Sequence, residues 1–213
     1  WTFNPMVDIA RDPRWGRIAE GSGEDPYLGS LIAAAKVRGY QGNDLSDPTT
    51  MLACVKHYAA YGAPKAGRDY HTVDMSDRVL RDTYLPPYKA AVDAGVATVM
   101  TAFNEVDGVP ASGNKYLMTD ILKNEWGFKG FIVTDYTSIE EMIDHGIVAN
   151  AKEATHLAFQ AGVHMDMQSG FYSKYIPELV KEGKISEDQL DNYVRDVLVM
   201  KYKLGLFDDP YRY

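Results

Sequence analysis

The sequence contains only one cysteine, Cys54, among its 213 residues, so the chain has no internal disulfide. No apolar run approaches the ~20 residues that a membrane-spanning helix requires. Basic residues are outnumbered by acidic ones, because the chain has 22 Lys and Arg but 30 Asp and Glu, which gives a net charge of -8. Nucleic-acid binding calls for clustered positive charge. The composition therefore supports neither a nucleic-acid partner nor a membrane span.

Several catalytic patterns are missing as well. The five histidines show none of the short, regular spacing that transition-metal sites use. No Gly-x-Ser-x-Gly elbow for a nucleophilic serine is present. The nearest glycine-rich segment, residues 21–23, lacks the later glycine of a dinucleotide-binding fingerprint. What remains is chemistry carried by carboxylates and hydrogen-bond donors.

Residues 131–135 give the strongest local signal. Phe131, Ile132 and Val133 form a continuous apolar run, which is typical of a strand buried on both faces. The run ends near Asp135, and α/β folds place their chemistry at the exits of parallel strands. Asp135 is therefore the first candidate for a functional residue.

The chain alternates between apolar runs and helical patterns, which predicts an α/β fold with a parallel sheet. A doubly wound open sheet and part of an eight-stranded (β/α)8 TIM-type barrel both fit this alternation. Polar residues at successive strand exits favour the barrel, of which about five units would be present. We expect strands at residues 3–9, 51–55, 96–103, 131–135 and 162–166, and helices at 28–38, 77–94, 116–126, 138–142, 151–161, 172–181 and 186–204.

The predicted strand exits bring together fixed cations, one imidazole and carboxylates. A set of this kind grips a polyhydroxylated ligand and offers carboxylate catalysis, which points to glycoside hydrolysis. The residues concerned are Arg17, Lys56, His57, Asn104, Asp135 and Asp166.

Four groups of motifs, spread from end to end of the chain, resemble glycoside hydrolase family 3, the β-glucosidases and β-xylosidases. The resemblance is strongest to the bacterial periplasmic β-glucosidases. The motifs are DPRWGR at 12–17 with GEDPY at 23–27, KHY at 56–58, GRDY at 67–70, and WGFKG at 126–130 leading to VTDY at 133–136.

The resemblance implies a retaining exo-β-glucosidase that hydrolyses terminal β-linked glucose and needs no cofactor or metal. Residues 1–213 would be part of a single barrel catalytic domain, because the chain opens in the middle of a motif. Preceding barrel units and a following C-terminal domain would then be absent. The expected partners are an oligosaccharide or β-glucoside and the missing parts of the parent chain, with a homodimer as an open alternative. Family members of this branch are periplasmic or secreted.

The resemblance also assigns roles by position. Asp135 matches the nucleophile, which forms a covalent glycosyl-enzyme in a retaining mechanism. Arg17, Lys56 and His57 match residues that bind the non-reducing sugar. Family members carry cis peptide bonds around the Lys-His pair, which brings both side chains to the site.

The resemblance also places Phe103 and Tyr136 beside the sugar. It leaves the identity of the acid/base residue open. Tyr136 directly follows the nucleophile in the VTDY motif. Many members have Tyr at the position of Phe103, whose ring lacks the hydroxyl. Glu141 is the internal candidate for the acid/base, six residues after Asp135. The family often supplies this residue from a following domain, so the alternative is a residue outside the chain.

Three other functions stay open. A β-xylosidase shares the family. A β-N-acetylhexosaminidase would use an Asp-Ser-His loop, where this chain has residues 69–71 (DYH). A non-catalytic sugar-binding or structural barrel fragment belongs to another class of protein.

Overall fold

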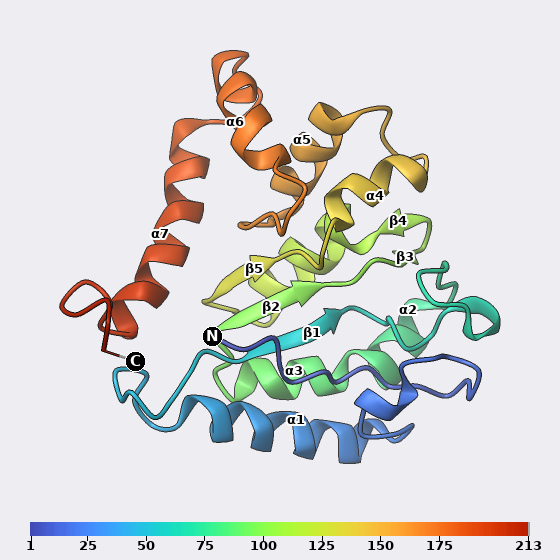
Figure 1. Cartoon of the computed structure of the whole chain (residues 1–213). Coiled ribbons are helices and arrows are strands. Elements are labelled where there is room, and N and C mark those ends of the chain that lie inside the picture. The colour runs from blue at the N-terminus through green and yellow to red at the C-terminus, as the bar shows by residue number, and fades with distance from the viewer. Residues whose placement is uncertain (213) are drawn as a thin grey trace.

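The computed structural model describes residues 1–212 and centres on a buried parallel sheet (Figure 1). Its strands are β1 (Cys54–Tyr58), β2 (Thr98–Thr101) and β5 (Phe131–Val133), in the order β1-β2-β5. Single parallel bridges, Met6 with Lys56 and Met165 with Val133, extend the two edges. A short antiparallel hairpin, β3 (Glu105–Val106) and β4 (Val109–Pro110), follows β2.

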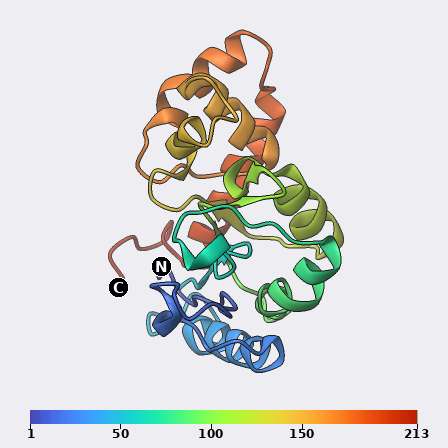
Figure 2. The same cartoon turned by 90° about the vertical axis from the view of Figure 1, so that its right-hand side faces the viewer.

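Helices connect the strands and cover them. In Figures 1 and 2, α1 and α3 lie together beside β1, whereas α4, α5 and α6 gather beyond β5. The helical segments are η1 (Ile18–Glu20), α1 (Pro26–Gln41), η2 (Lys65–Gly67), α2 (Asp77–Val79), η3 (Leu80–Tyr84), α3 (Pro86–Asp93), η4 (Ala111–Gly113), η5 (Tyr116–Glu125), α4 (Ser138–Asp144), α5 (Ala151–Ala161), α6 (Phe171–Lys181) and α7 (Glu187–Lys203). None of those within residues 1–212 combines the length and the apolar character needed to cross a bilayer.

The strands are buried on both faces, as the continuous apolar runs predicted. Val55, Val99 and Ile132 enter a large apolar cluster beneath α1, α3 and η5, while Cys54 and Met100 enter a second one with α7. Burial raises the pKa of the Cys54 thiol to about 12. The thiol is therefore protonated and enclosed, and it acts as a small core residue.

The α/β class is confirmed, with differences in the strands. Residues 3–9 and 162–166 contribute one bridge each instead of a full strand. The second strand begins at Cys54 and extends to Tyr58, because Cys54, Val55 and Tyr58 pair with β2, with an irregular register at Lys56 and His57. The charged pair therefore lies within the strand and not after it. The sheet has three strands within residues 1–212, so a barrel with five units stays a prediction.

The helix expected over 77–94 divides as its prolines indicated. It consists of α2, η3 and α3, and α3 begins with Pro86. Proline is compatible with the first turn of a helix because its missing N–H would have no partner there.

Two glycines allow a test of how tightly the sheet is packed. A Cβ atom on Gly130, just before β5, would lie 1.9 Å from the carbonyl oxygen of Ala97. A Cβ atom on Gly39, exposed in α1, would meet nothing within 4 Å. Gly130→Ala should lower the free energy of unfolding by at least about 1–3 kcal/mol through overpacking.

Gly39→Ala should raise the same free energy by about 0.5–1 kcal/mol, because alanine is the better helix former. Urea unfolding of both variants beside the parent protein measures the difference. Equal stability of the two variants would show that the approach of Gly130 to Ala97 is looser than described.

Candidate active site

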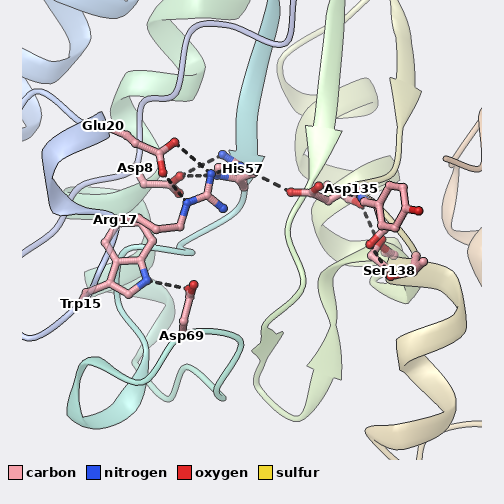
Figure 3. Close-up of polar contacts among 12 residues, drawn as sticks. Asp8, Trp15, Arg17, Glu20, His57, Asp69, Asp135 and Ser138 are labelled. Atoms are coloured by element: carbon pink, nitrogen blue, oxygen red, sulfur yellow. Dashed lines mark hydrogen bonds and ion pairs between the residues drawn. The ribbon is translucent and has the colours of Figure 1, made fainter. Parts of the chain in front are cut away.

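Arg17, His57 and Asp135 come together from three separate parts of the chain (Figure 3). His57 lies in β1, Asp135 follows β5, and Arg17 directly precedes η1. The Nε2 atom of His57 is 3.4 Å from Oδ2 of Asp135 and 3.2 Å from Nη2 of Arg17. The parallel sheet thus unites residues that are more than a hundred positions apart in the sequence.

His57 is held from behind by the buried carboxylate of Asp8. Its Nδ1 atom is 2.8 Å from Oδ2 of Asp8, and its backbone N–H donates to the same oxygen at 3.0 Å. The Tyr88 hydroxyl lies 2.5 Å from Oδ1 of Asp8 and 2.5 Å from the carbonyl oxygen of His57. An ionised carboxylate only accepts hydrogen bonds, so Nδ1 of His57 carries a proton and Nε2 faces the site.

Arg17 is positioned by Glu20 in η1. Its Nε and Nη2 atoms donate to the two carboxylate oxygens of Glu20 at 2.7 and 2.9 Å. This paired hydrogen bond raises the pKa of Arg17 and lowers the pKa of Glu20. Two-point pairing gives the guanidinium a defined orientation toward His57.

Lys56 supplies a second cation. Its side chain is partly buried, and its Nζ atom has no hydrogen bond or ion pair with any residue between 1 and 212. Its charge acts on Glu20, which places the ammonium on the Arg17 side of the site. The Lys56–His57 and Tyr58–Ala59 peptide bonds are both cis, which confirms the cis bonds expected around this pair.

The carboxylate of Asp135 is only partly exposed. Its Oδ1 atom accepts the backbone N–H of Tyr136 at 2.7 Å, while Oδ2 faces His57. Thr137 follows in a left-handed conformation with φ 62°, and the chain then enters α4 at Ser138. This abrupt turn presents Asp135 at the junction between strand and helix.

Glu141, on α4, lies near Asp135. Its Oε1 atom accepts the Thr137 hydroxyl at 3.2 Å. Burial raises the pKa of the Glu141 carboxyl, the Thr137 bond partly offsets this, and the charge of Asp135 raises it further. Within residues 1–212 the two carboxyls have no hydrogen bond to each other.

A buried row of hydroxyls ties α4 to the sheet. The Thr101 hydroxyl at the end of β2 is 2.6 Å from that of Ser112, and Ser112 is 2.7 Å from Ser138. All three side chains are buried. The helix that carries Glu141 is therefore fixed relative to the strands that carry His57 and Asp135.

The two aromatic candidates differ in exposure. Phe103 is buried and its ring packs against Tyr61 and Tyr70, with centroid separations of 5.8 and 4.7 Å. Tyr136 is 54% exposed. Of the two rings, Tyr136 is the one directly available to a ligand.

Sequence reasoning overlooked Asp8, Glu20 and Tyr88. Asp8 ends the first predicted strand, so the strand-exit argument could have identified it. Tyr88 followed the apolar spacing of its helix and was indistinguishable from a core residue.

The GRDY loop is anchored through Asp69. Asp69 accepts a 2.8 Å hydrogen bond from the indole of Trp15 and does not pair with Arg68 in the described chain (Figure 3). Asp69 also makes no hydrogen bond or ion pair with His71 within that part of the chain. Trp15 is itself buried.

Metal binding has no candidate cluster in the described residues. No group of three or more His, Cys, Asp or Glu side chains between positions 1 and 212 is arranged to hold an ion.

Comparison with known proteins places this geometry in context. Residues 1–200 match the family model described as "Glycosyl hydrolase family 3 N terminal domain". The chain is 49% identical over 210 residues to the periplasmic beta-glucosidase of Salmonella typhimurium, covering 99% of the chain and 28% of that protein. It is 37% identical to a putative beta-xylosidase of Formosa agariphila, covering 98% of the chain and 28% of that protein.

Solved structures give the same picture. A crystal structure of beta-glucosidase from Listeria innocua aligns with a TM-score of 0.97 and 50% identity, covering 99% of the chain and 30% of that protein. The same beta-glucosidase in complex with glucose aligns equally well, with a TM-score of 0.97. The chain thus spans less than a third of the length of these relatives.

The support behind His57 can be tested through Tyr88. Tyr88→Phe removes only the hydroxyl and leaves Oδ1 of the buried Asp8 without that donor. We expect the free energy of unfolding to fall by about 1–3 kcal/mol, the usual cost of a buried polar group left unpaired.

Tyr84→Phe is the matched control. Tyr84 lies in η3, one turn before Tyr88, and its hydroxyl makes no hydrogen bond to any residue that the structure describes. Its removal should change stability by less than about 0.5 kcal/mol. If thermal melting gives the two variants the same stability, Tyr88 does not support Asp8.

Proposed function

Since the chain belongs to glycosyl hydrolase family 3, we propose that it is the nucleophile-bearing part of a retaining exo-β-glucosidase. The observation that carries the proposal is the chain of contacts in which Nε2 of His57 lies beside both the Asp135 carboxylate and the Arg17 guanidinium. The substrate is a terminal, non-reducing β-D-glucosyl residue of an oligosaccharide or β-glucoside. The 49% identity to a periplasmic beta-glucosidase favours glucose over xylose.

The first step is attack by a carboxylate oxygen of Asp135 on the anomeric carbon. A bond forms between them, the glycosidic C–O bond breaks, and the leaving oxygen takes a proton from a carboxylic acid. Asp135 attacks as the carboxylate. The glycosyl-enzyme is then hydrolysed by water, which the same acid/base deprotonates.

The other polar groups bind the sugar. Arg17, Lys56 and His57 offer hydrogen-bonding groups to the hydroxyls of the non-reducing glucose. His57 is held by Asp8 and Arg17 by Glu20, so both are oriented before substrate arrives. Such preorganisation reduces the cost of binding. Tyr136 provides an apolar contact beside the same sugar, and the buried Phe103 supports the site from within.

Glu141 is the proposed acid/base within this chain. Burial raises the pKa of its carboxyl, so it retains its proton to higher pH than an ordinary glutamate. An acid supplied from outside residues 1–213 is the competing source.

The chain is further proposed to form part of one (β/α)8 barrel that additional segments complete. Preceding barrel units and a following C-terminal domain would supply them. This is in keeping with the share of the relatives that the chain covers. The name of the Salmonella relative supports a periplasmic location. A homodimer remains an alternative assembly.

The other functions have unequal support. A β-xylosidase is favoured by the 37% identical relative of that name. A β-N-acetylhexosaminidase would need a working Asp69–His71 pair, but Asp69 is bound to Trp15. If the chain were a non-catalytic fragment, Arg17, Lys56 and Asp135 would bind a sugar without hydrolysing it.

Trapping of the covalent intermediate tests the nucleophile. A 2-deoxy-2-fluoroglucoside with a dinitrophenyl leaving group should label the protein at its natural length on the peptide containing Asp135, because fluorine slows hydrolysis of the intermediate. Mass spectrometry of the digested protein locates the label. Asp135→Asn should abolish labelling and nearly all turnover, whereas Glu140→Gln, an exposed neighbour on α4, should retain both.

Three outcomes contradict specific parts of the proposal. Label on a peptide without Asp135 removes its role as nucleophile. Faster labelling by the corresponding xyloside moves the assignment to a β-xylosidase. Absence of both label and turnover favours the non-catalytic alternative.

The acid role of Glu141 has its own test. A general acid must be protonated, so activity should fall as pH rises through the raised pKa of Glu141. In Glu141→Gln this alkaline decline should vanish, and kcat/KM for alkyl glucosides should drop by about 10²–10⁴-fold. Dinitrophenyl glucosides should be little affected, because their leaving group needs no proton.

Added azide is a second test of the acid/base role of Glu141. In Glu141→Ala it should attack the glycosyl-enzyme and yield β-glucosyl azide, because a strong nucleophile needs no base. Glu140→Gln should keep the parent pH profile. An unchanged profile in Glu141→Gln would assign the acid to a residue outside this chain.

A further inference from the structure

Four aromatic rings form a continuous row from the protein interior to the surface beside the candidate site. Trp15 packs on Tyr61 at 5.5 Å, Tyr61 on Phe103 at 5.8 Å, and Phe103 on Tyr70 at 4.7 Å between ring centroids. Trp15, Tyr61 and Phe103 are buried, whereas Tyr70 is 49% exposed. Tyr70 is therefore the outer end of the row and the only one of these four rings open to solvent.

The row is attached to the sugar-binding groups at its inner part. The ring of Tyr61 lies 5.1 Å from that of His57, and the guanidinium of Arg17 is 5.5 Å from the Tyr61 centroid. Tyr70 is supported from below by both Phe103 and Tyr61. Its exposed side thus has a fixed place relative to the groups that would hold the terminal glucose.

The backbone at Tyr70 is also specialised. Tyr70 has φ 64°, a left-handed conformation that a bulky residue seldom adopts. The preceding Asp69 is anchored by the Trp15 indole, and Gly67 packs tightly against Arg14 and Trp15. The loop is thereby held in a shape that turns the Tyr70 ring toward solvent.

The negative charges of both candidate catalytic carboxyls, Asp135 and Glu141, also act on the phenol of Tyr70. The pKa of its phenol is raised by burial and by the negative charges of Asp69, Glu141 and Asp135. The ring of Tyr61 contacts His57, Arg17 and Tyr70, and Tyr70 also feels the charge of Glu141, so Tyr70 lies at the rim of the same site.

We propose that Tyr70 is a stacking platform for the ring of the leaving group, either a second sugar or an aryl aglycone. This inference rests on the proposed function. The leaving group departs from the side on which its oxygen is protonated, and that is the side of Glu141. The platform is rigid because Phe103 and Tyr61 support it, so the ordering cost on binding is small.

Selectivity between leaving groups tests the platform. β-D-Glucosyl fluoride carries the same glucose as cellobiose but has no second ring to stack. In the protein at its natural length, Tyr70→Ala should lower the ratio of kcat/KM for cellobiose to kcat/KM for glucosyl fluoride by about tenfold. Tyr70→Phe keeps the ring and should restore the ratio to within about twofold of the parent value.

A matched control separates this effect from general loss of an exposed tyrosine. Tyr27 on α1 is also largely exposed but lies outside the row, and Tyr27→Ala should leave the ratio unchanged. A parent-like ratio in Tyr70→Ala would overturn the platform, as would an equal loss in Tyr70→Phe, which would assign the effect to the hydroxyl. Parent protein that hydrolyses neither substrate would instead overturn the proposed β-glucosidase function, and the platform with it.

Discussion

The buried contact between Asp8 and His57 is the interaction on which the rest of the site depends. A carboxylate enclosed by protein is costly unless hydrogen bonds replace its lost water. Asp8 meets this need through the imidazole and backbone N–H of His57 and through the Tyr88 hydroxyl. The same bonds fix the direction of the imidazole. Satisfying one buried charge therefore also points Nε2 of His57 toward Asp135.

The parallel sheet brings the Asp8–His57 pair next to Asp135. Asp8, His57 and Asp135 belong to neighbouring segments, because residues 6–7 run beside Lys56 and β5 lies one strand beyond β2. The carboxyl ends of parallel strands share one edge, so groups placed there meet without any contact in sequence. The hydroxyls of Thr101, Ser112 and Ser138 then fix α4 against that edge.

Much of this arrangement could be predicted from the sequence, but the residues at which the strands begin and end could not. The apolar run before Asp135 and the family-like motifs identified the nucleophile candidate, and His57 does contact it, with Arg17 bound to His57. The strand at 51–55 was placed too early because apolar character ends at Val55, whereas pairing with β2 continues to Tyr58. Tyr88 escaped notice because its partners Asp8 and His57 are distant in the sequence, whereas Glu20 pairs with Arg17 three residues earlier and could have been found from that local spacing.

The candidate binding groups Arg17, His57 and Lys56 differ in whether they have an acidic partner within the protein. Arg17 is matched by Glu20, and His57 by Asp8, so these charges are largely balanced before a ligand arrives. Lys56 has no such partner in the described chain, although it lies on the same side. A group that stays unsatisfied in the empty protein gains most when a ligand supplies the missing acceptor. If these groups bind a sugar as proposed, Lys56 should contribute more to its affinity, and Arg17 and His57 more to its orientation beside Asp135.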